Sequence, residues 1–320
     1  MASRFLLLLL LGGVAMLAAV LAVALLVWAA LRASSRPAPT LGAAADRARR
    51  HALVVDVLAW VLLVLALFGG FAAVSAQPLS LQQGLLLGLV PAVSGTLFAL
   101  VHAAGDLTWP RPTGTVRRAP LVRRTVRDVA PTRLRRALWS WVGILTVGLV
   151  SAGLVADETA RAFPRSGADW TSASGPFPGW FYGGPLLTAA AVVLLAAELT
   201  LLLVARRPVV ADADPAWDLG LRRLSAHRVL RGTQAVLGLT TAGVLAVAGT
   251  AILNAAQGPV LNGITYPHAG LRVLGIALVI SAFASLVAAA TLTALPPEAG
   301  RSFPRLSQTP AAPVAAAGRQ

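Results

Sequence analysis

Seven long apolar stretches divide this chain, and each is long enough to cross a lipid bilayer. A membrane-spanning helix needs roughly 20 mostly apolar residues, and its backbone hydrogen bonds must all be satisfied inside the hydrocarbon. The sequence therefore predicts an all-α integral membrane protein, a polytopic bundle of about seven transmembrane helices in a single domain over 1–294. We expect the spans near 5–31, 53–76, 84–105, 137–156, 185–205, 229–255 and 269–294.

The two ends of the chain need separate interpretation. The apolar run from Phe5 to Leu31 is 27 residues long, well beyond the roughly 7 to 15 residues of a signal-peptide core, so we expect a retained span. The segment 295–320 is rich in proline and alanine and poor in large apolar residues. It is predicted to be a disordered cytoplasmic tail.

The arginines predict the orientation. The connectors 32–52, 106–136, 206–228 and 295–320 hold 22 of the 27 arginines, whereas the N-terminus and the connectors 77–83, 157–184 and 256–268 hold 3. Basic residues accumulate in the cytoplasmic loops of membrane proteins. The N-terminus is therefore expected outside the cytoplasm and the C-terminus inside, with the lipid bilayer as the principal partner.

Composition narrows the chemistry. Hydrophobic residues make up 57% of the chain and charged residues 12%, and the mean hydropathy is +0.75, which leaves too little polar surface to cover a soluble globule. The absence of cysteine excludes disulfides and thiolate catalysis. Lysine is absent too, which excludes Schiff-base chemistry with retinal or pyridoxal phosphate, and no cofactor is predicted. Exclusive use of arginine is typical of a high-GC bacterium, so we expect a bacterial cytoplasmic (inner) membrane.

The connector 106–136 is the most basic part of the chain. Between its arginines, Leu121, Val122, Val126 and Val129 fall near helical spacing, which would suit a short helix on an anionic leaflet. The arginines predicted to face lipid headgroups are Arg117, Arg118, Arg123, Arg124 and Arg127. The alternative is a plain topology anchor. No aromatic residue is interleaved among them, so the net charge of +15 does not predict nucleic-acid binding.

The connector 157–184 on the opposite side is rich in aromatic residues, glycine and proline. Aromatic residues next to a span usually lie in the interfacial belt. A gate or binding loop over the outer mouth is the functional alternative. The density of glycine and proline predicts that no regular helix forms there.

Two parts of the chain resemble each other. Asp46, Arg49, Arg50 and His51 lead into the second expected span, and Asp218, Arg222, Arg223 and His227 lead into the sixth. If this echo reflects a duplication, spans one to three and five to seven are parallel repeats, an arrangement found in some transporters.

Four polar residues are expected inside the membrane in its cytoplasmic half: Glu198, Asp56, His102 and Arg231. A charged side chain there costs about 2.5 to 3.5 kcal/mol, so each requires a reason. One interpretation pairs Glu198 with Arg231 or His102 to orient the helices. The other makes Glu198 a proton- or cation-binding carboxylate in a cavity open to the cytoplasm, and the cluster a ligand-binding site.

One short motif resembles an enzyme family. The stretch from Ala92 to Phe98 is similar to the G-x-S-G segment around the nucleophile of rhomboid proteases, and His268 begins a later span running in the same direction. The resemblance implies an intramembrane serine hydrolase with Ser94 as nucleophile and His268 as base. However, Ala92 replaces the first glycine, and Ser94 is expected in mid-span whereas His268 is expected at the outer edge.

The function predicted from these features is that of a permease-like or transport-associated protein. The alternative is a non-catalytic membrane scaffold or assembly factor that binds another membrane protein or a second copy of itself. No soluble domain large enough for nucleotide hydrolysis is present, so transport would be secondary or would need a partner. The four histidines, at 51, 102, 227 and 268, lack metal-ligand spacing, and no metal site is predicted.

Overall fold

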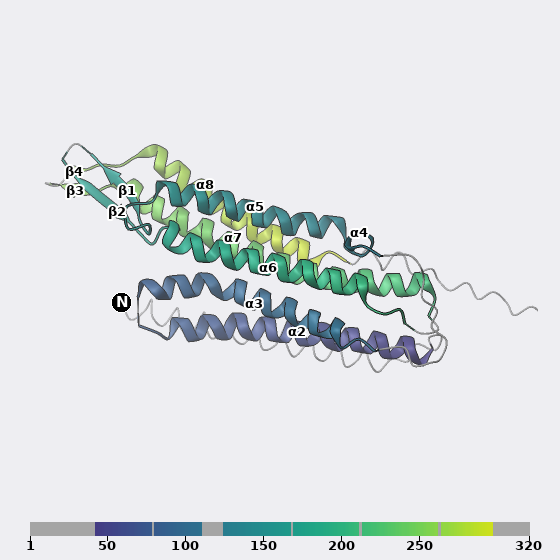
Figure 1. Cartoon of the computed structure of the whole chain (residues 1–320). Coiled ribbons are helices and arrows are strands. Elements are labelled where there is room, and N and C mark those ends of the chain that lie inside the picture. Colours follow the sequence, from purple (N-terminus) through teal and green to yellow (C-terminus); the bar gives the residue numbers. More distant parts are fainter. Residues whose placement is uncertain are drawn as a thin grey trace, which may run out of the picture.

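Six long helices lie side by side in the computed structural model, which describes residues 42–78, 80–110, 124–167, 169–210, 213–261 and 264–296. They are α2 (Ala43–Ser75), α3 (Leu81–Leu107), α5 (Thr132–Val155), α6 (Trp180–Arg206), α7 (Pro215–Gln257) and α8 (Ala269–Ala294) (Figure 1). Each is long and apolar enough to cross a membrane. The prediction of an all-helical chain with several such helices is confirmed.

Two expectations fall outside the described residues. The first expected span, 5–31, is not among them, so the count of seven stays a prediction. The expected tail is likewise outside, apart from its first two residues.

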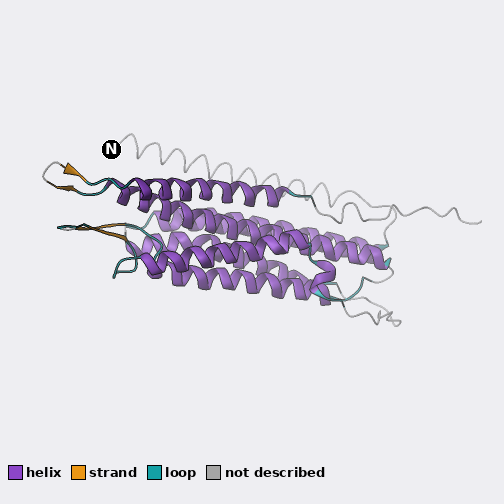
Figure 2. Ribbon diagram, turned by 90° about the horizontal axis from the view of Figure 1, so that it is seen from above, coloured by secondary structure: helices purple, strands orange, loops and turns teal. Residues whose placement is uncertain are grey.

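Successive helices run in opposite directions, so the bundle has two distinct ends (Figures 1 and 2). One end carries two small antiparallel hairpins. In the first, β1 (Phe163–Ser166) pairs with β2 (Thr171–Ser174), and in the second, β3 (Val260–Leu261) pairs with β4 (Ile264–Thr265). The opposite end carries the single-turn helix α4 (Val126–Val129), the start of α2 and α7, and most of the described arginines. We call these the hairpin end and the arginine end.

Two helices begin earlier than the apolar pattern predicted. α2 begins at Ala43 rather than near 53, and α7 begins at Pro215 rather than near 229. The added turns are polar, so a hydrophobicity pattern misses them. At α7 the start is set by Asp214, whose side chain accepts a hydrogen bond from the backbone N–H of Ala216, followed by proline in the first turn.

The prediction of no helix before 185 is wrong, because α6 begins at Trp180. Its first turns include Gly183 and Gly184, and Pro185 lies inside the helix. Proline removes only one hydrogen bond near the helix start, where little is lost. Tyr182 in this segment is buried in the main core, and we infer that this packing outweighs the low helix propensity of the glycines.

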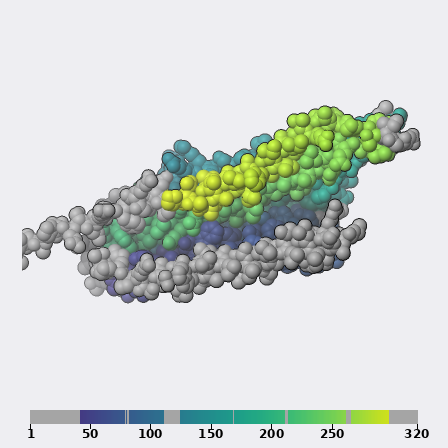
Figure 3. Space-filling view, turned by 180° about the vertical axis from the view of Figure 1, so that it is seen from behind, coloured from purple at the N-terminus to yellow at the C-terminus, as the bar shows by residue number. Residues whose placement is uncertain are grey.

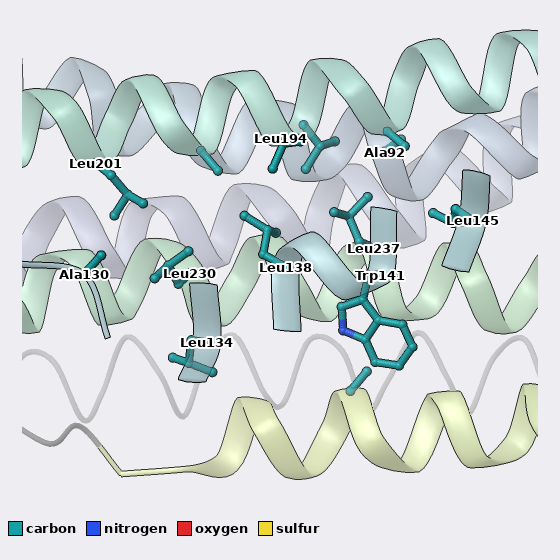
Figure 4. Packing of buried hydrophobic residues seen from close by; sticks show 14 of the residues in the cluster. Ala92, Ala130, Leu134, Leu138, Trp141, Leu145, Leu194, Leu201, Leu230 and Leu237 are labelled. Atoms are coloured by element: carbon teal, nitrogen blue, oxygen red, sulfur yellow. The ribbon is translucent and has the colours of Figure 1, made fainter. Parts of the chain in front are cut away.

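The main core lies among α5, α6 and α7, with α7 contacting every other long helix. Leucine side chains from facing helices interdigitate there (Figure 4). A polar link crosses the same layer: Trp141 of α5 donates to Gln234 Oε1 at 3.2 Å, and Gln234 Nε2 donates to Thr293 Oγ1 of α8 at 2.7 Å. This link joins three helices in a region that otherwise packs through apolar side chains.

The outward faces of the bundle are apolar. On α8, which lies across the face seen in Figure 3, Val273, Ile280 and Phe283 are each more than 60% exposed. Only Gly275, Ala282 and Ala289 of this helix are buried. Large apolar side chains outside and small residues inside are typical of helices that pack together within lipid.

Candidate functional site

Buried charged residues gather at the arginine end, where α2, α3 and α7 meet. Arg228 Nε of α7 lies 3.1 Å from Asp56 Oδ2 of α2, and its Nη1 donates to the carbonyl of Ala52 at 3.1 Å. Asp56 is 9% exposed and His102 of α3 is 5% exposed. His102 Nε2 lies 3.9 Å from Asp56 Oδ1, too far for a direct hydrogen bond. We call Asp56, His102 and Arg228 the Asp56 cluster.

Arg231 lies next to this cluster. One helical turn after Arg228, its guanidinium carbon is 5.2 Å from the centre of the Trp60 ring, within the range of a cation–π contact. Three of the four residues predicted to lie together, Asp56, His102 and Arg231, are thus brought to one place. Arg228 was assigned to a cytoplasmic connector, because the apolar window of the span began after it.

Glu198 does not belong to the Asp56 cluster. Its two carboxylate oxygens accept from Arg135 Nε at 2.9 Å and Nη2 at 3.0 Å, and Trp139 Nε1 donates to Oε1 at 3.0 Å. The predicted pairing of Glu198 with Arg231 or His102 is therefore wrong. Arg135 and Trp139, one turn apart on α5, hold this carboxylate, whose side chain is 21% exposed. Glu198 therefore links α6 to α5 and not to the Asp56 cluster.

A second buried ion pair lies within α7, and its arginine also binds the end of α6. Arg222 is 1% exposed and its Nε donates to Asp218 Oδ2 at 2.9 Å. Its Nη groups donate to the carbonyls of Val204, Ala205, Arg207 and Pro208 at 2.8 to 3.2 Å. These carbonyls are at the end of a helix, where they lack intrahelical partners, so one side chain satisfies them together.

Sequence reasoning treated Asp218 and Arg222 as part of a cytoplasmic connector. The signal that could have placed them is their spacing of four, which puts both on one helical face, together with Pro215 just before them. Asp218 is fully buried, which the spacing alone does not indicate.

Of the five arginines predicted to face lipid, only Arg124 and Arg127 lie in the described part of the chain; Arg117, Arg118 and Arg123 lie outside it. Arg124 turns inward and its Nη1 bonds Asp218 Oδ2 at 2.5 Å. Val129 is packed in the main core. Arg124 and Val129 thus face the bundle and not a lipid leaflet. Arg127 is exposed, and its contact with lipid headgroups stays a prediction.

A capping box starts the single turn of α4. Asp128 Oδ2 accepts from the backbone N–H of Thr125 at 2.7 Å and from its hydroxyl at 2.8 Å. These hydrogen bonds to the ionised form lower the pKa of Asp128 below its usual value. The start of α4 is thus stabilised by hydrogen bonds between its own residues.

The serine and histidine of the rhomboid-like pattern are each held within their own helix. Ser94 is 1% exposed and its hydroxyl donates to the carbonyl of Val90 at 2.8 Å. His268 Nδ1 accepts from the backbone N–H of Leu271 at 3.2 Å and caps α8 at the hairpin end. Within the described ranges, no group of three or more acidic, histidine or cysteine side chains is arranged to hold a metal ion.

Comparison of the chain with protein-family models, with curated proteins and with solved structures gives no match. The geometry of the site is therefore the guide to its role. Titratable side chains from α2, α3 and α7 meet in the interior, at one end of an otherwise apolar bundle.

Proposed function

We propose that this protein is a small permease-like protein of a bacterial cytoplasmic membrane, in which the Asp56 cluster is a proton-coupled binding site that opens toward the cytoplasm. The observation that carries the proposal is the burial of Asp56 with Arg228 and His102 between three apolar helices. Ionisable residues within membrane helices are rare and usually mark an ion or substrate path.

The membrane arrangement forms part of the proposal. The bundle has seven spans, the six described helices and a first span near 5–31, with the N-terminus outside and the C-terminus in the cytoplasm. The distribution of arginine supports it, 22 against 3 on the two sides. In this orientation the arginine end faces the cytoplasm, where its exposed arginines lie near anionic headgroups.

The mechanism follows from the ion pair. An ionised Asp56 holds Arg228 between α2 and α7. Uptake of a cytoplasmic proton on a carboxylate oxygen of Asp56 removes the negative charge and weakens the pair, which frees the Arg228 guanidinium to bind an anionic group. His102 Nε2 lies 3.9 Å from Asp56 Oδ1, so a small shift would bring it within hydrogen-bond reach of the same proton.

α3 is the helix best suited to move. It contacts α2, α6 and α7, and it contains Pro91, which interrupts its hydrogen-bond ladder. Gly88 and Gly95 lie within one turn of that proline. A bend at this point would shift His102 relative to Asp56.

The proposal is tested by proton flux in proteoliposomes that contain an internal pH-sensitive dye. Succinate, phosphate, amino acids and sugars are added in turn to the outside, and the internal pH is followed. We expect at least one solute to cause proton movement with the wild-type protein. Asp56→Asn should abolish that flux, because it removes the titratable group and nearly keeps the shape.

Glu198→Gln is the matched control. It neutralises a carboxylate that is also paired with an arginine, but away from the Asp56 cluster, so the flux should survive. Loss of flux in both variants, with folded protein, would place the coupling elsewhere. Absence of solute-induced flux in the wild type across the whole panel would reject the permease.

A non-catalytic scaffold is the second candidate, and the outward face of α8 favours it. Val273, Ile280 and Phe283 are exposed on a helix that packs chiefly against α7. This face would bind a helix of another membrane protein or of a second copy. Recovery of a stoichiometric partner after mild solubilisation, abolished by Phe283→Ala, would support the scaffold.

A further inference from the structure

A small cavity lies beside the Asp56 cluster, between the first half of α2, the end of α3 and the first half of α7. Its volume is about 20 Å³, and the surrounding space amounts to about 260 Å³ when the part open to solvent is included. About 10 to 15 Å³ is enough for a water molecule. The polar side chains around it are those of His51, His102, Asp106, Arg207, Ser225 and Arg228.

Arg207 is held rigidly in the wall of this cavity. It follows the last residue of α6, and its side chain is 1% exposed. Its guanidinium stacks on Trp109, with the guanidinium carbon 3.8 Å from the ring centre. Nη1 donates to Ser225 Oγ at 3.1 Å and more weakly to Asp106 Oδ1 at 3.4 Å. The stacking and the two hydrogen bonds fix the plane of the group.

The opposite edge of the same guanidinium is not used by the protein. Within the described ranges, Arg207 Nε and Nη2 are buried and make no hydrogen bond. In Arg135 the same two nitrogens are paired: Nε and Nη2 donate hydrogen bonds to the two carboxylate oxygens of Glu198. Two parallel N–H groups at this spacing match a carboxylate or phosphate. A buried donor without a hydrogen-bond partner is unfavourable, so this edge is suited to accept a partner from outside the chain.

The charge around the cavity also favours an anion. Arg124 and Arg222 share the single carboxylate of Asp218. Arg231 makes a cation–π contact but no ion pair within 4 Å in the described part of the chain. Burial lowers the pKa of Arg207 to about 10, so its guanidinium stays protonated at neutral pH. The positive charge at the arginine end therefore exceeds the negative charge nearby.

We propose that Arg207 binds a small oxyanion, a carboxylate or a phosphate group, through Nε and Nη2, with the rest of the anion in the part of this cavity that is open to solvent. Ser225 and Asp106 orient the guanidinium, Trp109 supports its face, and Arg228 adds positive charge on the far side. This site adjoins the Asp56 cluster, and it stands whether or not the protein transports anything.

The test is the thermal unfolding of the full-length protein in a zwitterionic detergent. Sodium acetate and sodium phosphate are titrated at constant ionic strength, with sodium chloride as the reference salt. A ligand that binds only the folded state raises the Tm in a saturable way. We expect such a rise with acetate or phosphate over chloride. The absence of a saturable rise with both anions, and with phosphatidylglycerol added to the micelle, would overturn the proposal.

Two variants locate the site. Arg207→Lys keeps the charge and removes the two-donor edge, so the oxyanion effect should fall at least tenfold in affinity, whereas Arg223→Lys on the surface should leave it unchanged. Asp106→Asn removes the carboxylate that competes for Arg207, so affinity should rise severalfold. An affinity unchanged in both site variants would overturn the assignment to Arg207, and the Asp106 variant keeps the test decisive if the Arg207 variant does not fold.

The source of the anion is distinguished in the same experiment. A shift produced by free acetate or phosphate, and lost in Arg207→Lys, identifies a soluble oxyanion. A shift produced only by phosphatidylglycerol, and likewise lost in that variant, identifies a lipid headgroup bound through the same edge. This readout needs no flux, so a failed transport assay and a failed binding assay are told apart.

Discussion

The two ends of this bundle are stabilised in different ways. At the arginine end, buried ion pairs join α7 to α2 through Arg228 and Asp56, and the end of α6 to α3 through Arg207 and Asp106, while Arg222 pairs with Asp218 within α7. In the hairpin half, α7 and α8 approach closely where glycine faces glycine, and a Cβ on Gly249 would come within 2.9 Å of the carbonyl oxygen of Gly275.

This difference indicates where a bundle of membrane-spanning helices tolerates buried ion pairs. An ion pair that is buried near the membrane surface is close to water during insertion, whereas the same pair at mid-membrane would be costly. The apolar half must then hold together by close fit, since lipid gives its helices no hydrophobic reason to associate. Among the described residues, the buried ion pairs accordingly lie at the arginine end, with the Asp56 cluster and Arg207.

Substitution of Arg222 should lower the free energy of unfolding more than any other change considered below. Replacing it by alanine leaves Asp218 buried and releases four helix-end carbonyls, and breaking a buried pair in this way costs about 3 to 5 kcal/mol. Arg50→Ala is the control, because Arg50 also follows an aspartate by four residues but its side chain is 58% exposed, and such pairs are worth about 0.3 to 0.5 kcal/mol. Denaturant unfolding in detergent measures both. Equal losses would mean that the arginine end is not held by buried charge.

The hairpin half is tested by glycine substitutions on α7. Gly249→Ala forces a methyl group against α8, and overpacking of this kind costs about 1 to 3 kcal/mol. Gly243→Ala, on the same helix, meets nothing within 4 Å and should be neutral or stabilising by up to about 1 kcal/mol. Thermal unfolding compares the two variants. A tolerated Gly249→Ala would show that the two helices do not depend on close contact there.

The sequence predicted the apolar helices well because hydrophobicity acts on each segment separately. α8 begins and ends at the residues expected, 269 and 294. The polar extensions of α2 and α7 were missed for the same reason, since a window that detects lipid-soluble segments ends where charge begins. Asp214 and Pro215 are local signals for the start of α7 that lie outside the apolar pattern.

The partners of buried charges were predicted less well. Glu198 was expected to meet residues of α3 or α7, yet it bonds Arg135 of α5. Depth in the membrane can be counted along a helix, but the direction in which a side chain points depends on how the helix is rotated against its neighbours. Arg207 was missed because a residue at the end of a span normally reaches water, whereas here Trp109 covers it.

The weakest change is expected in the acid sensitivity of the exposed segments at the two ends of the bundle. Here the hairpin end and the arginine end should respond to acid in the same way. Asp157, before the first hairpin, accepts from the Thr159 hydroxyl and from the backbone N–H groups of Arg161 and Ala162. These hydrogen bonds hold the pKa of Asp157 below its usual 3.8. Its contribution to stability is therefore present above about pH 3.8 and is lost as the pH falls through the lower folded-state pKa.

Asp157→Asn should make hydrogen exchange of the first hairpin less sensitive to acid below about pH 3.8, and Glu158→Gln on the exposed neighbour serves as the control. Asp128 is held by Thr125 in the same way at the arginine end, so Asp128→Asn should reduce the acid sensitivity of α4 similarly. Matching changes would show that the two ends differ in their interiors and not at their surfaces. If only Asp128→Asn reduces the acid sensitivity of hydrogen exchange, the two ends differ at the surface as well. The difference would then arise from the net positive charge of the arginine end.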